Sequence, residues 1–148
     1  MEKIEFNNDT YPAISKETLE AMQDNIENAI ETGKILYDNS LGSTSDVTLN
    51  ESVANFDYIC IVIIGTDTEK TIRIDNADNK SIYETLEYAS GNNHVVSFSR
   101  FVINQNKISV ITANCGYYTI DYLNSSVKMN LDRKNYIYIK KVIGYRRG

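Results

Sequence analysis

The chain has 148 residues, a formal net charge of -5 and a hydrophobic fraction of 42%, which is enough for one domain with its own core and a short appendage. Binding to a nucleic-acid backbone or to an anionic membrane surface needs a basic face, so neither partner is expected of this acidic chain. The longest apolar run, residues 58–64, is strand-length, and we expect no membrane insertion. The N-terminus has no apolar stretch of the secretory kind, so no signal peptide is expected.

The first predicted element is an amphipathic helix that begins after Ser15 and ends at Gly33. Ser15 is a good N-cap residue, and Ile14 and Leu19 stand where a hydrophobic staple would form. The apolar stripe consists of Leu19, Met22, Ile26, Ala29 and Ile30, and the first four of these residues have the 3-4-3 spacing of a coiled-coil seam. A seam under two heptads long is marginal alone and must be buried. Packing between neighbouring chains is favoured over packing on the chain's own domain.

From Lys34 onward the pattern changes to short strands separated by turn-forming clusters. The expected strands are residues 35–37, 47–49, 56–64, 71–74, 82–89, 95–103, 107–112, 117–123 and 135–145. Residues 82–89 are ambiguous, because Ile82 and Leu86 also suit a helical turn, and a strand is favoured there. Residues 38–45 are expected to be a turn-rich loop. Short strands without intervening helices predict a mainly β protein, an antiparallel β-sandwich (jelly-roll-like) preceded by one helix. The predicted organisation is an assembly segment, 1–33, followed by a head domain, 34–148.

Side chains that could do chemistry are few and scattered. The single histidine, His94, lies beside a Gly-Asn-Asn turn and is expected to be an exposed loop residue. His94, Cys60 and Cys115 lack the spacing of zinc ligands, and residues 75–79 lack the central glycine of a calcium loop, which favours a polar turn. The cysteines are expected to be reduced, with a disulfide between them as the alternative. We therefore expect no metal, no cofactor, no catalytic residue and no enzymatic activity.

Tyrosine is the unusual feature of the composition. The C-terminal third contains Tyr117, Tyr118, Tyr122, Tyr136, Tyr138 and Tyr145. A tyrosine has a flat apolar face and a polar tip, which suits interfaces and stacking on sugars, and it also favours strands. A place in the core or in a subunit interface is favoured for these residues, and the candidates for ligand contact are Tyr117, Tyr118 and Tyr122.

Several segments resemble proteins of phage tails. Residues 11–30, YPAISKETLEAMQDNIENAI, are similar to the helix P-x-I-[ST]-x-x-[NT]-L-x-x-[MI]-[QE]-x-x-I common in tail and baseplate proteins of phages that infect Gram-positive bacteria. Residues 36–43, LYDNSLGS, and 47–59, VTLNESVANFDYI, resemble the opening of the C-terminal β domains of the same class. Residues 135–145, NYIYIKKVIGY, resemble their closing strand.

The resemblance implies a tail-fibre, tail-tip or baseplate protein located in the virion tail. It implies a homotrimer assembled through the helix, with other tail or baseplate proteins as further partners. The β head would contact a host cell-wall polysaccharide or surface protein. Because the sequence departs from the longer members of this class, we expect neither their extended shaft nor their enzymatic domain. The alternative hypothesis is a monomeric carbohydrate-binding module or a small enzyme acting on cell-wall glycans.

Overall fold

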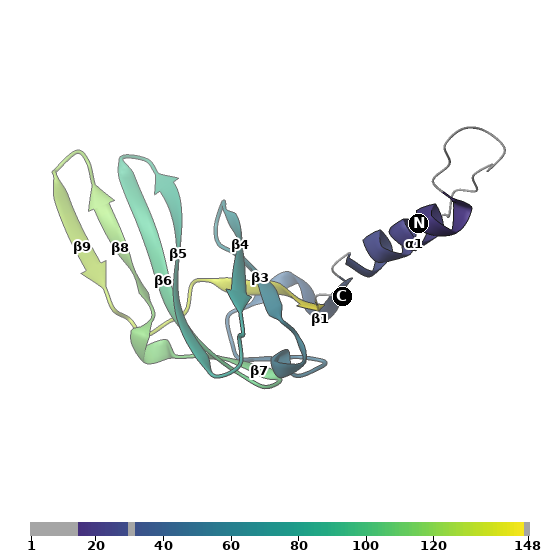
Figure 1. Cartoon of the computed structure of the whole chain (residues 1–148). Helices are drawn as coiled ribbons and strands as arrows, with labels where there is room; N and C mark the ends of the chain where they lie inside the picture. The colour runs from purple at the N-terminus through teal and green to yellow at the C-terminus, as the bar shows by residue number, and fades with distance from the viewer. Residues whose placement is uncertain (1–14, 30–31, 147–148) are drawn as a thin grey trace. The chain divides into compact units, whose positions relative to one another are not determined.

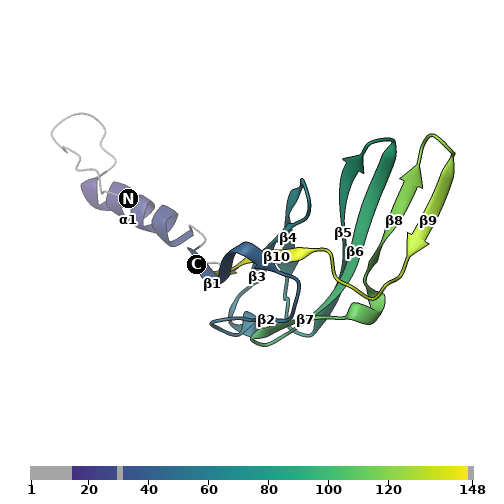
Figure 2. The same cartoon turned by 180° about the vertical axis from the view of Figure 1, so that it is seen from behind.

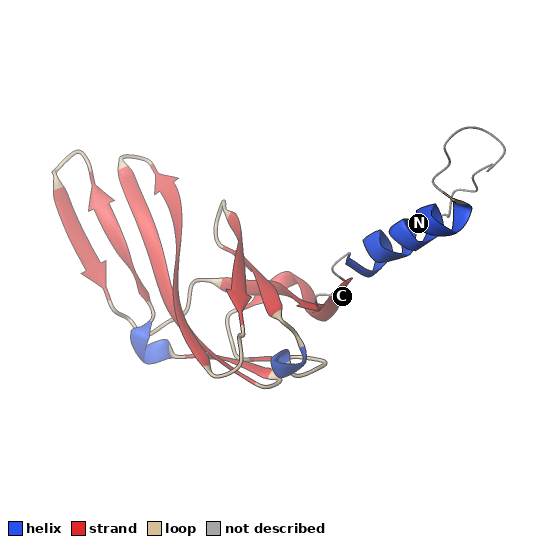
Figure 3. Cartoon of the chain, in the orientation of Figure 1, coloured by secondary structure: helices blue, strands red, loops and turns tan. Residues whose placement is uncertain are grey.

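The computed structural model describes residues 15–29 and 32–146, and of residues 26–29 and 32 only the backbone (Figure 1). The chain consists of two compact units, one of residues 33–145 and one of residues 1–32 with 146–148. Strands dominate residues 33–145 (Figure 3), and the predicted class, an antiparallel β-sandwich preceded by one helix, is confirmed. In the described ranges, no helix has the length and apolar character needed to cross a membrane.

Helix α1 spans Lys16–Ala29 and begins where the sequence predicts. The Ser15 hydroxyl accepts a hydrogen bond from the Thr18 N–H at 3.2 Å, which satisfies one of the free donors at a helix start. Met22 of the predicted seam is 53% exposed within the single chain. The side chains of Ile26, Ala29 and Ile30, and the staple residue Ile14, lie outside the described residues.

Gly33 does not end the helix, contrary to the prediction. The last helical residue is Ala29, and Gly33 lies in strand β1. A Cβ atom at Gly33 would stand 2.8 Å from Cε1 of Tyr145, so the missing side chain makes room for this ring. Glycine serves close packing as readily as it serves a helix end, and only the neighbouring strand distinguishes the two uses.

The first sheet of the sandwich has four strands. In spatial order they are β1 (Thr32–Ser43), β10 (Tyr138–Arg146), β3 (Tyr58–Ile64) and β4 (Glu69–Asp75). Strand β3 pairs antiparallel with β10 on one side and with β4 on the other. Its alternate residues Ile59, Ile61 and Ile63 are buried, so the apolar run of the sequence is a central strand, as predicted.

Residues 38–43 belong to β1 and not to the predicted loop. The turn-forming residues of this stretch bond to one another without reversing the chain: Asn39 accepts from the Leu41 N–H at 3.1 Å and donates to the Gly42 carbonyl at 3.3 Å. Gly42 has a φ of 75°, which only glycine adopts at little cost. The strand continues through these residues, and β1 lies next to β10 in the sheet.

The second sheet has six strands. They are β2 (Val47–Thr48), β7 (Lys107–Val110), β6 (Asn93–Asn104), β5 (Lys80–Ser90), β8 (Gly116–Asp121) and β9 (Ser126–Asn130). Two short 3₁₀ turns, Val53–Asn55 and Thr112–Asn114, complete the elements of the described chain. Strand β9 is missing from the sequence prediction, and the ambiguous stretch 82–89 lies in β5, as the prediction favours.

Strand β6 runs the length of the second sheet (Figures 1 and 2). Strand β5 pairs with it along one edge, while the other edge pairs with β8 over residues 93–98 and with β7 over residues 101–104. The turns of the β5–β6 and β8–β9 hairpins lie at the same end of the sheet, and the Tyr122 N–H donates to the Asn92 carbonyl at 3.1 Å between them. One end of β6 therefore belongs to a four-stranded extension of the sheet.

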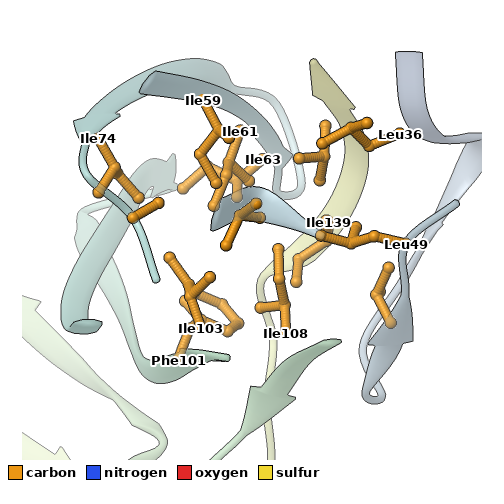
Figure 4. Packing of buried hydrophobic residues seen from close by; sticks show 14 of the residues in the cluster. Leu36, Leu49, Ile59, Ile61, Ile63, Ile74, Phe101, Ile103, Ile108 and Ile139 are labelled. Carbon is orange, nitrogen blue, oxygen red and sulfur yellow. The ribbon is translucent and has the colours of Figure 1, made fainter. Parts of the chain in front are cut away.

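The hydrophobic core lies where the two sheets overlap. Ile61 and Ile63 of β3 face Phe101 and Ile103 of β6 (Figure 4), and Phe101 and Ile103 are 1% and 0% exposed. Alternate residues of β6 from Val95 to Ile103 are buried, whereas the residues between them are half-buried. The buried residues of β6 therefore mark the inner face of the sheet. This face continues along the strand from the core toward the hairpin turns.

Candidate functional site

The inner face of the four-stranded extension is polar. Pairing of β5, β6, β8 and β9 places its side chains in three rows, Leu86–Ser97–Tyr117–Asn130, Tyr88–Val95–Thr119–Lys128 and Ser90–Asn93–Asp121–Ser126. Strand side chains alternate between faces, so these rows continue the face that carries Phe101 and Ile103 in the core. The face changes from aliphatic to phenol, hydroxyl and amide groups as it leaves the sandwich. A polar inner face indicates contact with water or a ligand.

A cleft of about 730 Å³ opens over this face, within the usual range of ligand sites, about 300–1,000 Å³. One wall consists of row residues from β5, β6 and β8. Leu41 of β1, residues 64–66 at the end of β3, and the segment leading into β10 provide the rest of the wall. Its aromatic lining residues are Tyr88, Tyr117, Tyr136 and Tyr138.

Tyr117 and Tyr136 form the best-defined part of the cleft. Their rings meet edge to face, with centroids 5.3 Å apart and an interplanar angle of 88°. The Tyr117 hydroxyl accepts from Asn130 Nδ2 at 2.7 Å, which leaves its own proton available. The Tyr136 hydroxyl donates to Asp132, and this hydrogen bond raises the pKa of Tyr136 to about 12. One phenol can therefore donate to a ligand, while its neighbour can accept.

Asn135 anchors the segment that carries Tyr136. Its side-chain oxygen accepts from Ser99 Oγ at 2.5 Å and from the Ile137 N–H at 2.9 Å, and its amide nitrogen donates to the Thr44 carbonyl at 2.9 Å. Asn135 and Ser99 are 5% and 0% exposed. Buried polar groups are stable when they are hydrogen-bonded, so this network sets the path of the chain into the cleft.

The three tyrosines predicted as ligand contacts lie in three different places. Tyr117 is in the cleft, and Tyr118 is on the opposite face of the sheet, where its ring centroid lies 5.1 Å from that of Phe98. Tyr122 is in the β8–β9 turn and is 65% exposed. Neighbouring residues of a strand point to opposite faces, so a Tyr-Tyr pair supplies one side chain to any one site. The predicted ligand contacts did not include Tyr88, Asn93, Tyr136 and Tyr138, which also line the cleft. Alternation along β5 and β6 was the available signal for Tyr88 and Asn93.

The rim of the site at the β8–β9 turn is held by Asp121. Its carboxylate accepts from Asn124 Nδ2 at 2.8 Å, from the Asn124 N–H at 3.1 Å and from the Leu123 N–H at 3.0 Å. The Asn124 side chain first, and then these backbone donors, hold the pKa of Asp121 below its ordinary value. Both oxygens of this carboxylate are therefore engaged by the turn.

The other residues considered for chemistry lie apart from the cleft lining. His94 is in β6 and not in the predicted loop, and its Nε2 lies 2.8 Å from Glu87 Oε2. The turn before His94 consists of Gly91 and Asn92 and ends one residue earlier than the Gly-Asn-Asn pattern suggests, because Ser90 and Asn93 are already paired. Cys60 and Cys115 form no disulfide. Within the described ranges, no three His, Cys, Asp or Glu side chains come together as a metal site.

Residues 75–79 form the predicted polar turn between β4 and β5. Asn76 and Asn79 have φ angles of 48° and 61°, which asparagine tolerates better than most residues. The Asp78 carboxylate accepts from the Gln105 N–H at 2.7 Å and so joins this turn to the β6–β7 turn. This carboxylate is used for a structural contact.

The fold and the cleft together define a β-sandwich module with a ligand-sized, tyrosine-lined opening at one end. Comparison of the sequence with models of known protein families and with curated proteins gives no match.

Proposed function

We propose that the chain is a structural attachment protein of a phage tail tip, baseplate or fibre, which forms homotrimers through α1 and binds a host cell-wall polysaccharide with its β-sandwich. The tyrosine-lined cleft is the observation that supports binding. The phage setting and the trimer rest on the resemblance of residues 11–30, 36–59 and 135–145 to tail proteins.

A sugar suits the chemistry of this cleft. Tyrosine rings present flat apolar faces to the C–H faces of a sugar. Tyr117 has a free donor and Tyr136 a free acceptor, and a sugar hydroxyl can both donate and accept. None of the lining residues of the cleft, all of which lie in the described chain, is charged. A protein receptor would instead need a surface of about 800 Å² per partner, and a concave cleft favours a smaller ligand.

Binding without catalysis also belongs to the proposal. Glycoside hydrolysis uses two carboxyl groups about 5–9.5 Å apart. The lining of the cleft contains no Asp, Glu, His or Cys among these described residues, and the nearby Asp121 is engaged by the β8–β9 turn. Cleavage of cell-wall glycans by the purified protein would be the result that supports an enzymatic function.

Tyr117→Ala is expected to weaken binding of purified Gram-positive cell-wall polysaccharide by about tenfold, which corresponds to about 1.4 kcal/mol. The change removes a ring from the cleft and the hydroxyl held by Asn130. Isothermal titration calorimetry measures the effect. Tyr118→Ala is the matched control, since it removes the same side chain from the next residue on the opposite face. Equal affinities of wild type and Tyr117→Ala would contradict the assignment of this cleft.

Met22→Lys is expected to convert the homotrimer to monomer, because it puts a charge into the proposed seam. Light scattering at micromolar concentration gives the mass. Ala21→Lys adds the same charge to the neighbouring residue, which lies outside the seam and is also exposed, and should leave the mass unchanged. A wild-type chain that is monomeric under these conditions would refute assembly through α1.

A further inference from the structure

A second hollow continues the cleft across the inner face of the sheet. It has a volume of about 260 Å³ and is lined by Asn93, Tyr117, Thr119, Asp121, Ser126, Lys128 and Asn130. Three of these residues, Asn93, Tyr117 and Thr119, also line the larger cleft. Shared lining residues make the two hollows one groove, which crosses β6 and β8 and reaches β9.

The groove runs out at the edge of the sheet. Strand β9 pairs with β8 and is the last strand in the order of its sheet. Its inward residues Ser126 and Lys128 are exposed. Strands are about 4.8 Å apart, so the distance from β5 to β9 across the sheet is roughly 14 Å. A ligand in the cleft can therefore continue past β9 into solvent.

Uncommitted polar side chains lie where the two hollows meet. Within the described ranges, the Asn93 amide and the Thr119 hydroxyl make no side-chain hydrogen bond, in contrast to Asn130 and Asp121, which hold Tyr117 and the turn. An amide and a hydroxyl offer both donors and acceptors to a ligand. Thr119 lies two residues beyond Tyr117 along β8, and Asn93 lies at the start of β6, so both are nearer the hairpin turns than Tyr117 is. Recognition can therefore extend beyond the aromatic pair.

We infer that the groove binds an internal stretch of a neutral polysaccharide chain. One sugar contacts Tyr117 and Tyr136, and the following sugars occupy the second hollow, where they contact Thr119 and Asn93 and then leave the groove over Ser126 of β9. Two observations favour an internal stretch over a single sugar or a chain end: the site has two connected hollows, and its β9 end is open. The uncharged lining of the larger hollow favours neutral sugars. The inference rests on the proposed function and specifies its ligand.

Chain length gives the first test. The polysaccharide that binds is partially hydrolysed, separated by size, and titrated into the full-length protein. Affinity is expected to rise with fragment length over the first few sugars and then to level off. It should also change little with salt, because a neutral ligand releases no counterions. Fragments of one or two sugars that bind as tightly as the polymer would overturn the inference.

Ser126→Trp gives the second test, because Ser126 lines the hollow next to β9 and is not among the lining residues of the larger cleft. Long fragments are expected to lose about tenfold in affinity, while the shortest fragments that bind keep theirs. Val127→Trp is the matched control on the outer face, where Val127 is 68% exposed. Thermal unfolding checks that both variants fold. The titration of fragments of increasing length uses the wild-type protein and does not depend on the folding of any variant.

The outcomes separate the inference from the proposed function. Absence of any polysaccharide binding would refute the proposed function itself. Polysaccharide binding with no dependence on length and no effect of Ser126→Trp would refute only the internal-stretch inference. Binding that falls steeply with salt and is lost in Lys128→Gln would show an acidic ligand held by Lys128, and would refute the neutral chain.

Discussion

Asn135→Ala is expected to lower the free energy of unfolding by about 3 kcal/mol and to abolish ligand binding by the cleft. The change leaves the Ser99 hydroxyl, the Ile137 N–H and the Thr44 carbonyl without their partner. Two of these contacts are fully buried, and an unsatisfied buried polar group retains its desolvation cost. Binding is lost as well, because Tyr136 depends on the path of this segment.

Urea denaturation measures the stability change, and calorimetry at a temperature where the variant is folded measures binding. Ser99→Ala removes one donor and leaves the other two bonds of Asn135, so a loss of about 1 kcal/mol is expected. Asn50→Ala is the surface control, since Asn50 is exposed, and it should stay within about 0.5 kcal/mol of wild type. A loss for Asn135→Ala no larger than that of the control would show that the network does not support the fold.

Gly116→Ala is expected to cost about 3 kcal/mol of stability and to weaken binding as well. A Cβ at Gly116 would lie 2.3 Å from the Asn130 carbonyl oxygen and 2.9 Å from Cζ of Phe98. Backbone cannot rotate away as a flexible side chain can, so β9 has to move away from β8. Asn130, whose amide holds the Tyr117 hydroxyl, moves with it.

Gly91→Ala is the control that separates the effect of crowding on stability from the effect of backbone conformation. Gly91 has a φ of 60° and nothing within 4 Å of an added Cβ, so its substitution should cost only the roughly 1 kcal/mol of a left-handed conformation and leave binding unchanged. Gly116 has no such φ. The two variants are compared by urea denaturation and by polysaccharide titration. A larger loss in Gly91→Ala than in Gly116→Ala would contradict the crowding argument.

Local chemistry was sufficient to predict much of the secondary structure. The Ser15 hydroxyl caps the helix through a local hydrogen bond, and this bond does not depend on what the helix packs against. The run at residues 58–64 has no polar side, so it had to be a central strand. Residues 38–43 misled the prediction because their Asn and Gly residues satisfy one another within a strand, and nothing local distinguishes that from a chain reversal.

Strand β9 could not be predicted with the same rules. Its apolar residues Val127 and Met129 are 68% and 52% exposed, and its polar residues face inward. Alternation over five residues does not by itself indicate which side is inner. The inner side of β9 is set by its pairing with β8, and the inner side of β8 is set by its register with β6.

The residue pattern thus determined an antiparallel β-rich domain after a capped amphipathic helix, because caps, turns and alternation act between residues close in the chain. The tertiary structure alone determined the cleft. Tyr117 comes from β8, while Tyr136 precedes β10 and reaches Tyr117 through a network that joins Asn135 to Ser99 and Thr44. These contacts join residues from 36 to 91 positions apart in the chain, and strand register and buried hydrogen bonds, which bring such residues together, leave no periodic signal in a single sequence.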